Sequence, residues 1–385
     1  MTNYLNIINS PQIKHDKYFE VLRDFRKGGI NLENFEEIIK LISKLPDIAE
    51  RKPSDFALFD KFGLSDISEN DQIVITRELQ RRSIESNKKC WHPEASLETC
   101  RINSSGKIII SAAHSIQNNG ILSRIVENGH VMGYTLDKAE FEGKEYGKNH
   151  ASIFWGFCNI HDSIFNPIEI SPYKGTEEQH FLFAYRGFVI SSHKKEESTY
   201  WIDYGEQSIN DIKKNKKLFD SAILSKEYSV IKTEVFELPA MYPIAVSSSF
   251  YLDFDFNGNA INHSEDRMED IYVTLFPTNN KTYFLISYFK QDANLYSDLG
   301  NQLRKRNKLK SDITMLVAAH TENVYFNPIY YKTFIEKHEE ELERISFQSQ
   351  FDYASVGKDN EISIEFSFTP NDYLNNSFGI NFFGY

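Results

Sequence analysis

The spacing of hydrophobic and polar residues changes twice along the chain and predicts three zones. Residues 1–89 repeat apolar side chains at intervals of three and four, which predicts a helical N-terminal region. Residues 90–203 combine two short runs of β-forming residues with two helical segments. These elements are the strands 107–113 and 151–157, a helix that begins near Asn159, and an apolar helix over 181–190.

The third zone, residues 204–385, opens with a charged helix and continues with strand-like segments. The predicted strands are 229–238, 245–256, 270–276, 282–289 and 361–368, and the predicted helices are 295–308 and 330–344. This mixture predicts an α+β fold whose third zone contains a mainly antiparallel sheet. No linker rich in Gly, Pro or Ser separates the zones, so we expect the three domains to have soft boundaries.

Composition narrows the classes of partner. The chain has 385 residues, and 43 basic against 55 acidic side chains leave a formal net charge of −12. That balance disfavours a protein that coats a polyanion, so any contact with nucleic acid needs a local basic patch. Such clusters on helices are more often solvated faces than binding sites. The two densest are Lys213, Lys214, Lys216 and Lys217, and Arg304, Lys305, Arg306, Lys308 and Lys310.

Targeting signals are not visible in the sequence. Residues 1–17 lack the apolar core of a secretory signal, and no run of about 18 apolar residues is present. We therefore expect a cytoplasmic protein without a membrane partner. The sequence leaves the oligomeric state open.

Three cysteines are too few for a disulfide framework, but their positions are informative. All three lie between residues 90 and 158, and Cys158 and His161 form a Cys-x-x-His pair at a predicted strand-to-helix junction. A thiolate and an imidazole at this spacing can bind one tetrahedral ion. We therefore predict that Cys90, Cys100, Cys158 and His161 bind zinc, with His92 as the competing ligand. The alternative is a set of reduced cysteines unrelated to a metal.

The order of residues around these ligands resembles the treble-clef HNH nucleases, which carry a zinc-supported ββα fold. His114 ends a predicted strand, Asn149 precedes the next strand, and Asp162 follows His161. The resemblance implies that His114 activates a water molecule and that Asn149 orients it. It further implies that Asp162 helps hold Mg²⁺ or a similar divalent ion at a phosphate, while the zinc is structural.

The resemblance covers only about residues 90–169 and departs from the family in three ways. About 35 residues separate His114 from Asn149, so an inserted hairpin or helix is expected over 121–144. The first metal knuckle has nine spacer residues instead of two, and the usual Gly-Gly turn before the middle Asn is absent. The same segment also resembles a group of bacterial proteins without an assigned function.

Three functions follow as hypotheses. The first is a metal-dependent nuclease acting on nucleic acid, in an arrangement typical of bacterial antiviral-defence or toxin effectors, with the third zone binding a protein partner or substrate. The second is a non-catalytic, zinc-stabilised binding or sensor protein, which the net charge favours. The third is a hydrolase of a nucleotide or another small molecule. Arg186, inside an apolar helix, predicts either a buried pair with an acidic residue or a phosphate contact. Glu169 either adds a carboxylate near Asp162 or faces solvent.

Overall fold

A computed structural model describes most of the chain beyond residue 82. The described residues are 83–135, 142–198, 205–264, 266–321, 323–350, 353–356, 362–365 and 369–384. The predicted N-terminal helical region therefore lies almost wholly outside them, except for residues 83–87, which are helical. The larger of two compact units comprises residues 87–195, 212–346 and 370–385.

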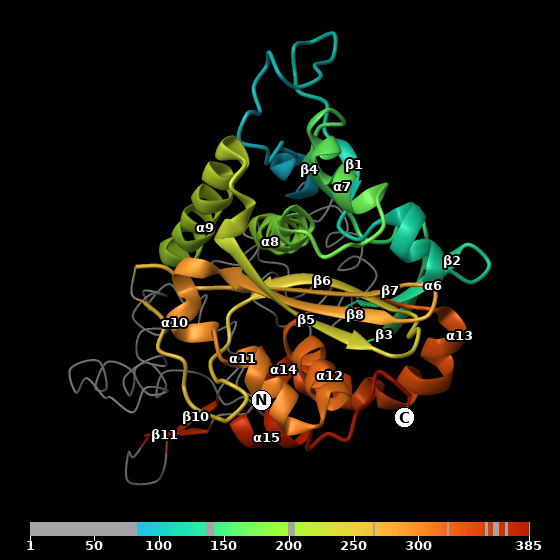
Figure 1. The fold of residues 1–385 in the computed structure, drawn as a ribbon, viewed down its shortest axis with the longest axis vertical. Coiled ribbons are helices and arrows are strands. Elements are labelled where there is room, and N and C mark those ends of the chain that lie inside the picture. The colour runs from blue at the N-terminus through green and yellow to red at the C-terminus, as the bar shows by residue number, and fades with distance from the viewer. Residues whose placement is uncertain are drawn as a thin grey trace, which may run out of the picture. The chain divides into compact units, whose positions relative to one another are not determined.

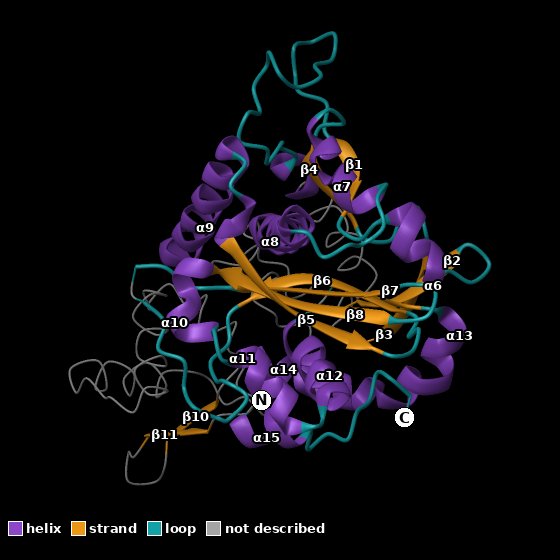
Figure 2. Ribbon diagram, viewed as in Figure 1, coloured by secondary structure: helices purple, strands orange, loops and turns teal. Residues whose placement is uncertain are grey.

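The larger unit is built on a seven-stranded, fully antiparallel sheet (Figure 2). Its strands in spatial order are β3 (Glu142–Gly147), β2 (His130–Thr135), β9 (Val324–Phe326), β6 (Ile244–Phe250), β7 (Ile271–Pro277), β8 (Thr282–Phe289) and β5 (Ile231–Leu238). All seven residues of β7 are buried, because helices cover both faces of the sheet. The predicted α+β class with a mainly antiparallel sheet is confirmed.

Helices form a layer on each face of this sheet (Figure 1). One layer contains α8 (Glu177–Ser198) and α9 (Gly205–Ser225). The opposite layer contains α11 (Leu299–Arg306), α12 (Leu309–His320) and α14 (Glu339–Gln350). The shorter helices are α6 (Ser123–Ile125), α10 (Ala293–Tyr296), α13 (Pro328–Tyr330) and α15 (Pro370–Asn375). No helix within the described ranges is both long enough and apolar enough to cross a membrane.

Two expected elements end earlier than the hydrophobic pattern suggests. The strand predicted to reach residue 256 stops at Phe250, because a turn follows in which Asp255 accepts hydrogen bonds from the amides of Asn257 and Asn259. The helix predicted over 295–308 starts in α10 and ends at Arg306, where Asn307 adopts a left-handed conformation with φ 53°. In the smaller unit, β10 (Tyr353–Val356) pairs with β11 (Ile362–Glu365) within the predicted strand 361–368.

A second, two-stranded sheet carries the chemistry predicted from the sequence. β1 (Ser111–His114) pairs antiparallel with β4 (Ile153–Phe157), so that Ser111 lies opposite Phe157 and His114 opposite Ile153. A 3-10 turn (His161–Phe165) and α7 (Asn166–Glu169) follow directly. The chain between β1 and β4 forms the β2–β3 hairpin, which pairs with β9 in the large sheet. An inserted hairpin or helix was expected over residues 121–144.

Helix α8 is held against the large sheet at a glycine. A Cβ atom added at Gly187 would lie 2.7 Å from the backbone oxygen of Ser248 in β6, closer than real contacts allow. We expect Gly187→Ala to lower the free energy of unfolding by about 1–3 kcal/mol, because the backbones must separate. Chemical denaturation measures this loss. Helix propensity alone would make Gly187→Ala stabilising by about 1 kcal/mol, so unchanged or increased stability of this variant would contradict the close-packing explanation.

Candidate metal centre and neighbouring polar site

The four predicted metal ligands converge on one point in the structure. The sulfur atoms of Cys90, Cys100 and Cys158 lie 3.4, 3.4 and 3.3 Å from Nδ1 of His161. All four ligand atoms lie within 4.8 Å of one another, and Cys100, Cys158 and His161 are buried. These residues come from three separate stretches of chain, so the tertiary fold assembles the cluster.

Hydrogen bonding alone does not explain this arrangement. A ring nitrogen has either one N–H or one lone pair, so it can satisfy only one of the three sulfurs around it. A tetrahedral zinc ion with Zn–S near 2.3 Å and Zn–N near 2.0–2.1 Å places each sulfur about 3.5 Å from the nitrogen. The observed distances match that value. The cluster can therefore bind a metal such as zinc.

Backbone hydrogen bonds place the ligands. The amide of Trp91 donates to the carbonyl of Gly156 at 2.8 Å, which aligns Cys90 with the end of β4 and with Cys158. The next turn carries His161 back over Cys158, where its amide donates to the Cys158 sulfur at 3.5 Å. Cys100 closes a turn in which its amide donates to the carbonyl of Ser96 at 3.0 Å. Nine spacer residues thus still bring Cys90 and Cys100 to one ion.

Burial makes the thiols dependent on a cation. It raises the pKa of Cys90 to about 12, so without a metal this thiol stays protonated at neutral pH. Burial also acts to raise the pKa of Cys158, but the backbone amides of His161 and Ile160, which donate to its sulfur, leave that pKa below its usual value. Zinc binding would therefore release protons from the site.

The flat face of the His161 ring contacts a second histidine, His92. His92 stacks on it with ring centroids 4.2 Å apart and an interplanar angle of 6°. Ligand atoms of His92, Glu94 and His161 also lie within 4.8 Å of one another, which makes a second possible metal-binding group. His92 thus lies beside His161 and outside the Cys3His group. A carboxylate such as Glu94 often orients a metal-bound histidine through its second ring nitrogen.

His114 lies at the end of β1, where its ring is half-buried. The backbone of Asn149 lies close enough to the ring to act toward raising the pKa of His114. Nε2 of His114 is buried and has no hydrogen-bond partner among the described residues. Oδ1 of Asn118 is also buried without a partner there, while its Nδ2 donates to Oδ1 of Asn149 at 3.2 Å. Two unsatisfied polar atoms therefore flank Asn149.

Three charged side chains surround this polar site. Arg186 of α8 is only 2% exposed, pairs with Oε1 of Glu169 at 2.5 Å, and stacks over the Phe165 ring at 4.2 Å. Burial lowers the pKa of His114, and the charge of Arg186 lowers it further. Burial raises the pKa of Asp162, which Arg186 opposes and Glu169 reinforces. His114, Asp162 and Glu169 thus share the field of one buried cation.

The two basic clusters predicted from the sequence differ in how many of their side chains form ion pairs. Lys214 and Lys216 form ion pairs with Asp266 and Asp220, whereas Lys213 and Lys217 are exposed. In the other cluster, Arg304 pairs with Glu234. Arg306 binds Asp312 and the carbonyl of Phe256. Arg304 and Arg306 of the second cluster therefore bind groups of the protein itself and connect its elements.

Some site residues were not identified from the sequence. Glu94 lies four residues after Cys90, and nothing in the local sequence links it to His161. The loop around His114 is also supported from far along the chain. Ser115 donates to Oδ1 of Asn323 at 3.1 Å, and the amide of Ser152 donates to the hydroxyl of Tyr325 at 2.8 Å. The Asn-x-Tyr pattern before a short strand carries no signal for this role.

Comparison with known proteins does not assign the chain to a family. No family model matches the chain, and neither a curated protein nor a solved structure is significantly similar to it.

Proposed function

We propose that the protein is a metal-dependent phosphodiesterase of the HNH nuclease type, with a structural zinc ion bound by Cys90, Cys100, Cys158 and His161. The observation that carries the proposal is the buried Nε2 of His114, which has no partner among the described residues and lies at the end of β1, the strand that pairs with β4 ahead of Cys158. A buried imidazole nitrogen without a partner is costly unless a ligand or water satisfies it. Such a nitrogen is suited to remove a proton from a water molecule.

His114 has a nitrogen suited to a general base. A neutral imidazole has a lone pair on one ring nitrogen, and we assign it to Nε2, which has no partner among the described residues. In the proposed reaction Nε2 takes a proton from water, the water oxygen attacks phosphorus, and the P–O bond to the leaving oxygen breaks. The leaving oxygen then takes up a proton. Asn149 would orient the base through its backbone, which lies near the ring, while its side chain accepts a hydrogen bond from Asn118.

Asp162 and Glu169 are the carboxylates that would hold Mg²⁺ or a similar ion. Asp162 makes no side-chain hydrogen bond within the described ranges, and it lies close enough to Glu169 for the second charge to raise its pKa. Mg²⁺ commonly takes one or two carboxylates together with substrate phosphates. When bound, such an ion stabilises negative charge on the phosphate and on the leaving oxygen.

Direct assay tests the function. We expect the zinc-loaded protein to cleave single- or double-stranded DNA or RNA when Mg²⁺ or Mn²⁺ is added, and to stop when EDTA removes the added ion while the zinc content stays at about one per chain. All four nucleic acids should be tried, because the sequence does not choose among them. Failure to cleave any of them, with zinc present and the fold intact, would contradict the proposal.

The pH dependence of cleavage should identify a base with a lowered pKa. Burial and Arg186 lower the pKa of His114 below its usual 6.5, so the ring stays neutral at pH 7 and also at somewhat lower pH. We expect kcat/KM to be level near pH 7 and to fall only when the pH drops below 6.5. An acidic limb at or above pH 7 would argue against His114 as the base.

A second candidate is a non-catalytic binding or sensor protein stabilised by the same metal centre. Two observations favour it: Nε2 of His114 is enclosed by protein atoms, and the net charge is −12. In that case His114 supports the fold, and replacing it lowers stability without removing any activity. The third zone would then provide the surface for a protein partner.

A further inference from the structure

The segment 90–94 places two further metal-binding side chains on the outer side of the Cys3His cluster. Three of the four cluster ligands are buried, and Cys90 is the exception, because it is only half-buried. His92, two residues later, is also half-buried, and Glu94 is exposed. The least buried ligand of the cluster thus lies in the same short segment as an accessible imidazole and an accessible carboxylate.

The outer side chains and the cluster have one ligand in common. Ligand atoms of His92, Glu94 and His161 lie within 4.8 Å of one another, and His161 is at the same time the nitrogen ligand of the Cys3His cluster. An ion bound by the outer group would therefore already lie beside a ligand of the inner one. The carboxylate of Glu94 also supplies negative charge at the exposed side, where a cation arrives from solvent.

The geometry of the outer group does not allow a second permanent ion. The rings of His92 and His161 are stacked, with centroids 4.2 Å apart and an interplanar angle of 6°. The lone pair of an imidazole nitrogen lies in the plane of its ring, so two stacked rings cannot both direct a lone pair at one ion.

His92 must therefore turn before it can share an ion with His161. Its Nδ1 accepts a hydrogen bond from the amide of Glu94 at 3.2 Å. Metal binding breaks this bond, because Nδ1 either becomes the ligand or takes up the ring proton when Nε2 binds. Three ligands, one of them exposed, also leave a coordination position of zinc to water. The outer group is thus suited to bind an ion briefly.

We propose that His92 and Glu94 form a capture site, which binds zinc from solvent and passes it to the Cys3His cluster through the shared ligand His161. The ion moves inward because the inner group offers three sulfur ligands, which bind zinc more tightly than a carboxylate does. The thiols release their protons to solvent as the ion arrives. The inference rests on the metal centre and does not depend on phosphodiester cleavage.

Release of zinc from the folded, metal-loaded protein tests the capture site, because an ion leaves along the path by which it enters. Release to a chromogenic chelator is measured at chelator concentrations where the rate no longer depends on the chelator. Equilibrium competition with the same chelator gives the zinc affinity. The test variants are Glu94→Gln and His92→Gln. The matched control is Glu98→Gln, which removes the same charge from an exposed residue of the same loop that belongs to neither metal-binding group.

We expect Glu94→Gln to release zinc about tenfold more slowly than the wild-type protein with unchanged zinc affinity, because loss of an intermediate slows uptake and release equally. His92→Gln should change the rate in the same direction, and Glu98→Gln should match the wild type. If Glu94 only orients His161, its replacement lowers the affinity and speeds release, which is the opposite result.

Faster release by Glu94→Gln, release at the wild-type rate, or equal slowing by Glu98→Gln would each overturn the inference. Equal slowing by the control would assign the effect to the general negative charge of the loop. A wild-type protein that contains no metal and takes up none would remove the capture site together with the metal centre.

Discussion

Replacing Cys158 with Ser should remove the metal and destabilise the larger unit by several kcal/mol. The short β1–β4 sheet and the turns around it have little core of their own, so metal binding supplies much of their folding free energy. Loss of one of four ligands also leaves buried thiols around an empty centre. Metal content by elemental analysis and the midpoint of chemical denaturation measure the two effects.

A histidine pair provides the matched control for this prediction. His161→Gln removes the fourth ligand, whereas His150→Gln makes the same change at an exposed residue outside the cluster. Only the first should lose metal and stability. If wild-type protein contains no zinc or other transition metal, and Cys158→Ser unfolds with the wild-type midpoint, the cluster is a set of packed thiols and the metal centre is disproved.

Replacing His114 with Ala should reduce nuclease activity by about 10²–10⁴-fold, the usual contribution of a general base. The loss should fall mainly on kcat, because a general base acts on the attacking water in the reaction step rather than on substrate binding. Initial rates at saturating nucleic acid, together with circular dichroism of the variant, separate lost chemistry from lost folding.

Asn149 and His130 make this prediction specific. Asn149→Ala keeps the backbone that acts on His114, so its effect should be much smaller than that of His114→Ala. His130→Ala changes an exposed histidine on β2 and should leave activity intact. Retained cleavage by folded His114→Ala protein would refute the catalytic role. Unfolding of that variant would instead support the non-catalytic candidate.

Local sequence pattern predicted most of the strands and the four candidate metal ligands. The four consecutive strands β5 to β8 follow from runs of β-branched and aromatic residues between turns, because burial on a sheet selects such side chains. Cys90, Cys100, Cys158 and His161 were recognisable because thiol and imidazole ligands are few in this chain and gather in one region. The residue types of these four ligands restrict which metal ions the region can bind.

Long-range contacts were outside the reach of that pattern. The β2–β3 hairpin pairs with β9, which lies nearly 200 residues later in the chain. Residue composition does not predict which of two distant strands pair with each other. Asn149 acts on His114 through its backbone, which every residue type supplies, so no sequence motif marks this contact. Strand ends also depend on competing turns. β6 ends before its predicted limit, because the turn at Asp255 follows it.

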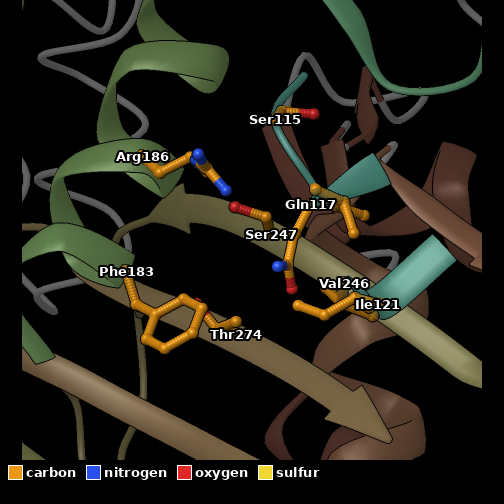
Figure 3. A pocket seen from close by; sticks show the side chains of 9 residues that line it. Ser115, Gln117, Ile121, Phe183, Arg186, Val246, Ser247 and Thr274 are labelled. Carbon is orange, nitrogen blue, oxygen red and sulfur yellow. The ribbon is translucent and has the colours of Figure 1, made fainter. Parts of the chain in front are cut away.

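The sequence by itself determined the α+β class, the central strands and the four candidate metal ligands, because periodicity and ligand chemistry depend on residue type. Only the tertiary structure decided that Arg186 pairs with Glu169 and points toward Ser247 across a small pocket (Figure 3). It also decided that Glu94 and His92 flank His161. These arrangements arise from packing between elements distant in the chain, and their energies depend on burial, which local sequence does not specify.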